Sequence, residues 1–282
     1  MFDKLKAMFR IGGAKIGMVE TLNRITDHPK IGVNTAEIDR IMDNKRIYKN
    51  KFPDVSYVNS DGMRMHRAFH SLNVSKVVSR KLAKLVFNDG CAISIDNDEA
   101  DQFLQSVFND NKFRKNFGEE LEAGYAIGGL VLRPYVDTKT NKIKISFCRA
   151  DTFYPLQSNT NDISEAAIAT ITQQNEGKKN VYYTLLEFHE WENSTYYIRN
   201  ELYRSEEQSQ TGVRVPLPTL DKYKELKEES ALVGFTRPLF VYIKLAGKNN
   251  IDIDSPLSLG IIDNAKRQLI DINEKYDEFM NE

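Results

Sequence analysis

The feature that most constrains the fold is a series of alternating apolar and polar residues between Gly128 and Ser205. Residues 128–159 read "GGLVLRPYVDTKTNKIKISFCRADTFYPLQSN", which predicts a β-hairpin that Pro155 ends. Three more strand-like segments follow: "EAAIATITQQ", "VYYTLLEFHEW" and "STYYIRNELYRS". They are rich in Thr, Val, Ile and Tyr, which suit a half-buried pleated surface. Because "KKN" and "ENS" break the run like turns, the sequence predicts a meander of antiparallel strands.

Helical segments flank the predicted meander. Apolar residues recur at helical spacing, and Thr35 and Asp96 or Asp98 are good N-caps. Shorter strands are expected at 91–95 and 238–246. The expected fold class is therefore α+β: N-terminal helices plus an antiparallel β-meander or sandwich, ending in a long helix. The expected helices are 19–26, 35–49, 63–87, 99–111, 115–129 and 221–230.

The last segment, 254–282, has the pattern of a helix that packs against other helices. Ser255 suits the N-cap and Pro256 the first turn. The apolar positions then follow in steps of three and four, which is a heptad seam. Since the chain stops inside this helix without a C-cap, we expect the natural protein to continue beyond Glu282. The seam consists of Ile262, Ala265, Leu269, Ile272, Tyr276 and Phe279.

Charge is unevenly distributed along the chain. Residues 1–90 carry 17 Lys and Arg against 9 Asp and Glu, whereas the rest carry 22 against 31. A basic third joined to an acidic remainder can attract nucleic acid or the acidic part of a neighbouring copy, and two solvated faces of opposite sign are the plainer alternative. We predict three parts: a basic helical arm (1–90), an α+β domain (91–255) and the terminal helix (256–282). The candidate basic interface is Lys76, Arg80, Lys81 and Lys84.

Motifs that would indicate catalysis or metal binding fail on inspection. His66 and His70 have zinc-site spacing on the expected helix, but Arg67 replaces the glutamate of a metalloprotease motif. Residues 96–101, "DNDEAD", begin like a calcium loop, but Val107 stands where the loop needs a glutamate. No phosphate-binding loop or nucleophile elbow occurs in the sequence. We therefore expect no catalytic residue, no cofactor and no metal.

An enzyme that processes glycans is a weaker alternative. Glu187, Glu190 and Glu192 lie close together with His189. They fall on one strand, however, so a charged strand at the surface of a sheet explains them better than paired catalytic carboxylates. The sequence also lacks an apolar run of 18 residues, so we expect no membrane span.

Several segments, taken in order, carry a family resemblance. They are "SLNVSKVVSRKLAKLVFNDGCAISID", "GYAIGGLVLRPYVD", "IKISFCRADTFYPLQSN", "YYTLLEFHEW", "TRPLFVYIK" and "DSPLSLGIIDNAKRQLIDINEKYDEFMNE". From about residue 20 to the end the chain resembles a portal protein of tailed bacteriophages, in particular the group from long-tailed phages of Gram-positive hosts. Members continue into clip, second stem helix, tunnel loop and crown, so this chain resembles a portal truncated before the clip.

The resemblance implies a function in the virion. It implies a ring of twelve copies at one capsid vertex, built in the host cytoplasm, through which double-stranded DNA is packaged and ejected. Residues up to about 255 would be the wing, and 256–282 the first stem helix. Implied partners are the terminase, head-completion proteins and capsid or scaffold proteins. Another head–tail connector or minor capsid protein, without DNA translocation, is the alternative.

The residues of the terminal helix suit such a conduit. From Asp271 onward the helix has five acidic residues and Lys275 as its one basic residue. Acidic groups repel phosphate, so a wall of them would let DNA slide. The candidate channel-facing residues are Asp271, Glu274 and Glu278.

Overall fold

The computed structural model describes residues 21–281, except 138, 160–161, 178 and 246. The first 20 residues of the predicted basic helical arm (1–90) therefore lie outside the described residues. The chain divides into two compact units. The described part of unit 1 is residues 21–33 and 152–238, and that of unit 2 is 34–151 and 239–281. The three-part division at residues 90 and 255 stays a prediction.

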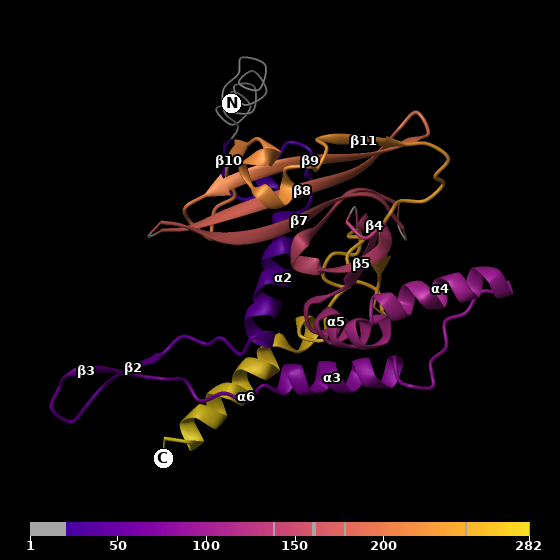
Figure 1. Ribbon diagram of the computed structural model, residues 1–282. Coiled ribbons are helices and arrows are strands. Elements are labelled where there is room, and N and C mark those ends of the chain that lie inside the picture. Colours follow the sequence, from indigo (N-terminus) through magenta and orange to yellow (C-terminus); the bar gives the residue numbers. More distant parts are fainter. Residues whose placement is uncertain (1–20, 138, 160–161, 178, 246, 282) are drawn as a thin grey trace. The chain divides into compact units, whose positions relative to one another are not determined.

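The described residues of unit 1 form a seven-stranded antiparallel sheet (Figure 1). Its centre is β7 (Ile163–Glu176), β8 (Lys179–Glu192) and β9 (Thr195–Ser205), which pair in chain order and confirm the meander. The edges carry β6 (Phe153–Ser158) at one end and β10 (Gly212–Val215) with β1 (Thr21–Leu22) at the other, while β11 (Glu229–Leu232) pairs with β9.

One apolar cluster stabilises unit 1. Leu185 of β8 and Leu202 of β9 are buried against Leu217 and Leu220. The last two belong to a chain of short 3-10 turns, η3 (Leu217–Thr219) and η4 (Asp221–Tyr223), which covers this side of the sheet. A further short turn, η1 (Ile25–Asp27), follows β1.

Unit 2 contains the α-helices of the described chain (Figure 1). They are α2 (Thr35–Tyr48), α3 (Val74–Val86), α4 (Asp98–Asp110), α5 (Phe113–Ile127) and α6 (Lys266–Phe279). A three-stranded sheet of β12 (Val241–Ile243), β4 (Leu130–Asp137) and β5 (Lys142–Arg149) packs with α5. A separate hairpin pairs β2 (Val55–Val58) with β3 (Arg64–Arg67). The α+β class is thus confirmed.

Helix α5 is the centre of unit 2. Its Leu121 is buried with Ala83 of α3 and Leu245. Phe113 stacks on Phe117, with ring centroids 5.1 Å apart. At the C-terminus Gly128 takes a left-handed conformation (φ 103°), as its place in the sequence predicted. This tightly packed helix leads directly into β4.

Four expected helices or strands are wrong over all or part of their length. Residues 63–73 are not helical, because the turn after β2 folds them back as β3. The Oδ1 atom of Asn59 accepts the Asp61 and Met63 amides in that turn, and the helix starts only after Asn73. Residues 91–95 form no strand. The described part of 19–26 and the segment 221–230 form short strands and 3-10 turns instead of helices.

Pro155 does not end a hairpin; it lies inside β6, opposite Ala166. Proline is tolerated there because β6 is an edge strand, which leaves one row of backbone groups unpaired.

The terminal helix begins about ten residues later than its cap signal predicted. Ser255 does not cap a helix: its hydroxyl donates to the Oε2 atom of Glu37 at 2.8 Å. Asn249 donates to the same oxygen at 3.0 Å. Helix α2 therefore holds the preceding loop, and regular structure starts with η5 (Asp263–Ala265) and α6.

Candidate assembly site

The described chain offers an oriented helix, α6, in place of a catalytic centre. Two polar residues one turn apart, Asn273 and Asp277, are both buried. The Leu72 amide donates to the Asn273 Oδ1 atom at 2.7 Å, and the His70 amide donates to the Asp277 Oδ1 atom at 2.8 Å. We call this side of α6, Asn273 and Asp277, the anchor face.

Arg67 of β3 makes the strongest contact with the anchor face. Its two terminal nitrogens donate to the two Asp277 oxygens at 2.6 and 2.7 Å, which is the bidentate geometry of strong arginine–carboxylate pairs. These hydrogen bonds, together with the His70 amide, lower the pKa of Asp277 to about 2. Asp277 is therefore ionised at any pH near neutrality, and the anchor persists there.

A second polar network fixes the chain just before α6. Arg40 donates to the Asp263 Oδ2 atom at 2.5 Å and to Glu37 at 3.0 Å. Asn44 and the Gly260 amide also donate to Asp263, both at 2.7 Å. Burial raises the pKa of Asp263, and these donors oppose that rise. Both ends of the segment leading into α6 are thus bonded to α2.

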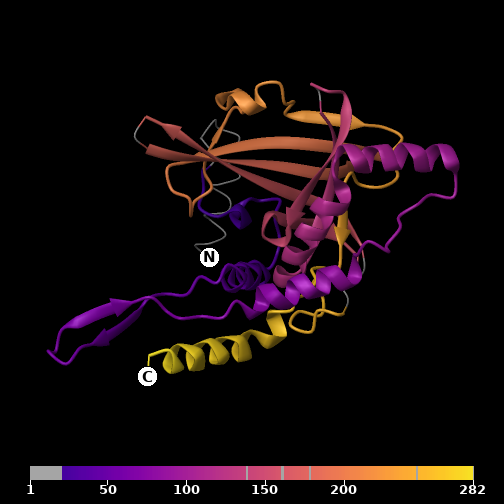
Figure 2. The ribbon, with the colours of Figure 1, turned by 60° about the horizontal axis from the view of Figure 1, so that its bottom comes forward.

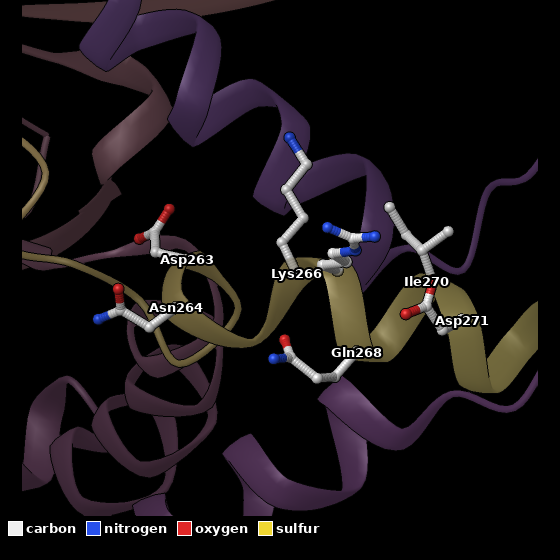
Figure 3. Close-up of a pocket in the computed structure, with 7 residues that line it drawn as sticks. Asp263, Asn264, Lys266, Gln268, Ile270 and Asp271 are labelled. Carbon is white, nitrogen blue, oxygen red and sulfur yellow. The ribbon is translucent and has the colours of Figure 1, made fainter.

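A shallow pocket lies at the start of α6 (Figure 3). Lys266 extends away from it toward α2, where it pairs with Asp43. Because the lysine is paired and the pocket is open to solvent, the arrangement does not resemble an enclosed reaction site. The lining residues are Asp263, Asn264, Lys266, Arg267, Gln268, Ile270 and Asp271.

The predicted apolar seam is distributed unevenly. Ile262 is fully buried inside unit 2 and Ala265 lies in η5, so both precede α6. The other four follow one side of α6, next to the anchor face, because successive residues rotate by about 100°. Within this group Ile272 is 47% exposed and Phe279 is 72% exposed. We call Leu269, Ile272, Tyr276 and Phe279 the apolar strip.

The three predicted acidic residues are exposed. They flank the anchor face on the side away from the apolar strip. At about 100° per residue, Asp271, Glu274 and Glu278 share that side. Glu278 also accepts a hydrogen bond from Lys275 at 2.6 Å. We call Asp271, Glu274 and Glu278 the acidic strip.

The four predicted basic residues lie on the exposed side of α3. The helix buries Ser75, Ser79 and Ala83, which recur every four residues. The basic residues occupy other positions around the helix, and all are exposed. The basic stripe consists of Lys76, Arg80, Lys81 and Lys84.

The carboxylates of the enzyme alternative have structural partners. Glu187 and His189 are buried rather than at the surface of a charged strand, so that interpretation was wrong for this pair. The two side chains lie 2.7 Å apart, and His189 also bonds the Tyr196 hydroxyl at 2.6 Å. Glu190 pairs with Lys30 at 2.8 Å. Within the described ranges, no three His, Cys, Asp or Glu side chains gather as a metal site would require.

Sequence reasoning missed the anchor face. Its signal was present: Asn273 and Asp277 are four residues apart and therefore share one side of a helix. Their partners could not be found in this way, because Arg67 and the 70–72 backbone are about 200 residues away in the chain.

No described helix has both the length and the apolar character needed to cross a bilayer. A search of curated proteins found no match. The family model described as "Phage portal protein, SPP1 Gp6-like" matches residues 27–282, which is most of the chain and includes both units. The family is structural and non-enzymatic, in agreement with an anchored helix and polar groups that serve the fold. The chain therefore belongs to the SPP1 Gp6-like family of phage portal proteins.

Proposed function

We propose that this protein is one subunit of the ring at a single capsid vertex through which double-stranded DNA is packaged and ejected. Membership of the portal family implies an oligomeric ring and a place in the virion. The finer proposals are a ring of twelve copies, assembly in the host cytoplasm, and α6 as the first stem helix after a wing.

The observation that carries this proposal is the division of α6 into three sides. The anchor face holds the helix to its own subunit through Arg67 and Asp277. The apolar strip and the acidic strip are left on either side of it. A helix fixed in rotation can present one side to a neighbouring subunit and another side to a channel.

The apolar strip supports side-by-side packing of subunits. Ile272 and Phe279 are substantially exposed in the single chain. Fully burying a side chain of this size contributes about 1.5–3 kcal/mol. In a ring each helix would repeat this contact with the next, as heptad seams do.

The acidic strip supports a channel-facing role. Each phosphate that a protein neutralises adds affinity for DNA, and a conduit that bound tightly would stall its cargo. Exposed carboxylates at Asp271, Glu274 and Glu278 repel phosphate instead.

The remaining surfaces fit further partners of a portal. We propose that the basic stripe faces acidic strands of the adjacent copy, in the head-to-tail contact that a ring requires. The terminase, the head-completion proteins and the capsid or scaffold proteins are proposed partners on the strength of the family resemblance.

The test is a charge reversal with a matched control. Changing Asp271, Glu274 and Glu278 together to Lys should reduce DNA packaging or trap DNA in the ring, because lysines attract phosphate. The control reverses three exposed acidic residues of unit 1, Asp221, Glu225 and Glu228, with the same change in charge. Packaging and DNA retention at wild-type levels in the first variant would refute the channel-wall role. Electron microscopy that showed no ring with a central hole of DNA width would refute the ring itself.

A further inference from the structure

The β2–β3 hairpin projects from unit 2. From here on, the arm means this hairpin with its flanking residues, 51–70, and not the predicted basic region 1–90. Its strands pair in a defined register, with Tyr57 opposite Met65. At the tip Gly62 has the left-handed conformation (φ 78°) that the turn requires. At the base the rings of Phe52 and Phe69 lie 5.1 Å apart. Each end of the arm is therefore built by specific contacts.

The arm has one apolar face. Side chains alternate between the two faces of a strand, so Val55, Tyr57 and Met65 share one face with Arg67, whose side chain at the inner end is bonded to Asp277. Ser56, His66, Val58 and Arg64 lie on the other. Tyr57 is 43% exposed and Met65 is 41% exposed. Among the residues that the structure describes, no third strand extends the hairpin.

A two-stranded hairpin with exposed apolar side chains is at best marginally stable in water. A neighbour that covers the face would remove this apolar surface from water, and that burial is favourable. Within the two strands the basic residue of this face is Arg67, which is paired with Asp277, so it is not available for the phosphate contacts that DNA binding needs.

The root of the arm is bonded to α6. Arg67, the last residue of β3, makes the bidentate pair with Asp277 of α6. Both views show the arm running out beside α6 (Figure 1), and Figure 2 shows this most clearly. The arm and the apolar strip are thus parts of one connected structure, and a subunit that packs on the strip lies next to the arm.

The arm is also long enough for this contact. Its base at Phe52 and its tip side at Val58 are six residues apart, and extended chain spans about 3.3 Å per residue, or about 20 Å in all. Packed helices lie only about 8–10 Å apart. A head-to-tail ring contact uses a different surface on each of the two subunits, and a projecting arm supplies one of them.

We propose that the apolar face of the arm, Val55, Tyr57 and Met65, packs on the next copy of this chain and forms one continuous subunit interface with α6. The proposal rests on the proposed ring and adds the element that holds its subunits together.

The first experiment replaces the apolar face without removing strand propensity. The Tyr57→Thr and Met65→Thr double variant places a β-branched residue, which favours strands, at both positions. The matched control, Val58→Thr with His66→Thr, changes the other face of the same hairpin. Sedimentation velocity of the purified protein across a concentration series gives the concentration at half-assembly. We expect at least a tenfold rise for the first variant and less than a twofold change for the control. Equal effects of the two variants, or no effect of the first, would overturn the proposal.

The second experiment identifies what the arm touches. A photo-reactive benzoylphenylalanine replaces Tyr57 in an equal mixture of isotopically heavy and light chains. We expect crosslinked peptides that join a heavy chain to a light one. Crosslinks confined to one chain, for example to residues 1–20, or none in assembled rings, would overturn the proposal.

The two proposals fail in different ways. If the unmodified protein forms rings while the arm variant assembles equally well, the arm inference is wrong and the ring stands. If no ring forms at any concentration, the proposed function fails, and heavy–light crosslinks at position 57 still decide whether the arm docks on a second copy.

Discussion

Gly260 gives the sharpest test of how the segment before α6 is fixed. A Cβ added at this position would lie 2.7 Å from the carbonyl carbon of Ala126 and closer still to its oxygen. Carbon atoms in good contact are about 3.5–4.0 Å apart, so the overlap is about 1 Å. The neighbouring atoms are backbone at the end of α5 and cannot rotate away. Gly260→Ala must therefore displace either α5 or the loop.

The cost of this displacement follows from the structure. Overpacking a tight site typically costs about 1–3 kcal/mol. The shift would also lengthen or break the hydrogen bond that the Ile261 amide donates to the Tyr125 carbonyl at 2.8 Å. Its loss would add about 1–2 kcal/mol to the destabilisation. We expect Gly260→Ala to destabilise unit 2 by about 3 kcal/mol in total.

In a denaturant titration, the unfolding of each unit can be followed by a different spectroscopic signal. The described α-helices belong to unit 2, so far-UV circular dichroism follows that unit. The single tryptophan of the sequence, Trp191, lies in β8 of unit 1, so its fluorescence follows unit 1. We expect the variant to lower the helical midpoint much more than the fluorescence midpoint.

A matched control lies in α5 itself. A Cβ at Gly118 would meet only the Phe87 ring, at 4.0 Å, which is an ordinary contact. Gly118→Ala should therefore stabilise the helix by about 0.5–1 kcal/mol. A Gly260→Ala protein with the wild-type helical midpoint would refute the steric argument.

Two further predictions concern α6. The pKa of Asp277, about 2, lies below the ordinary carboxyl value of about 3.9; the anchor therefore stabilises the fold above about pH 4 and is lost as the pH falls toward 2. Asp277→Asn should flatten the fall in unfolding stability between pH 4 and 2, and parallel curves for the two proteins would contradict this. Phe279→Ser should leave the unfolding free energy of the monomer within about 0.5 kcal/mol, because the ring is exposed, yet raise the concentration at half-assembly. Unchanged assembly, measured by sedimentation, would remove Phe279 from the subunit contact.

Much of the candidate site was predictable, because its residues recur at helical spacing along a single helix, α6. The apolar strip and the acidic strip follow from the spacing of residues along a helix. The rotation of that helix within the subunit did not follow, because it depends on Arg67 and the 70–72 backbone. The same contacts hold part of the expected 63–73 helix, from Arg67 to Leu72, as non-helical chain at the root of the arm.

By itself the sequence determined the elements whose pattern is local. The alternation in β7, β8 and β9 and the glycine after α5 each act within a few residues, so they could be recognised without the fold. Tertiary structure alone decided where α6 begins. Ser255 carried a good capping signal, but its hydroxyl bonds to Glu37, more than 200 residues away. A cap contributes only about 1 kcal/mol, so a network of buried polar contacts made by the folded chain can override it.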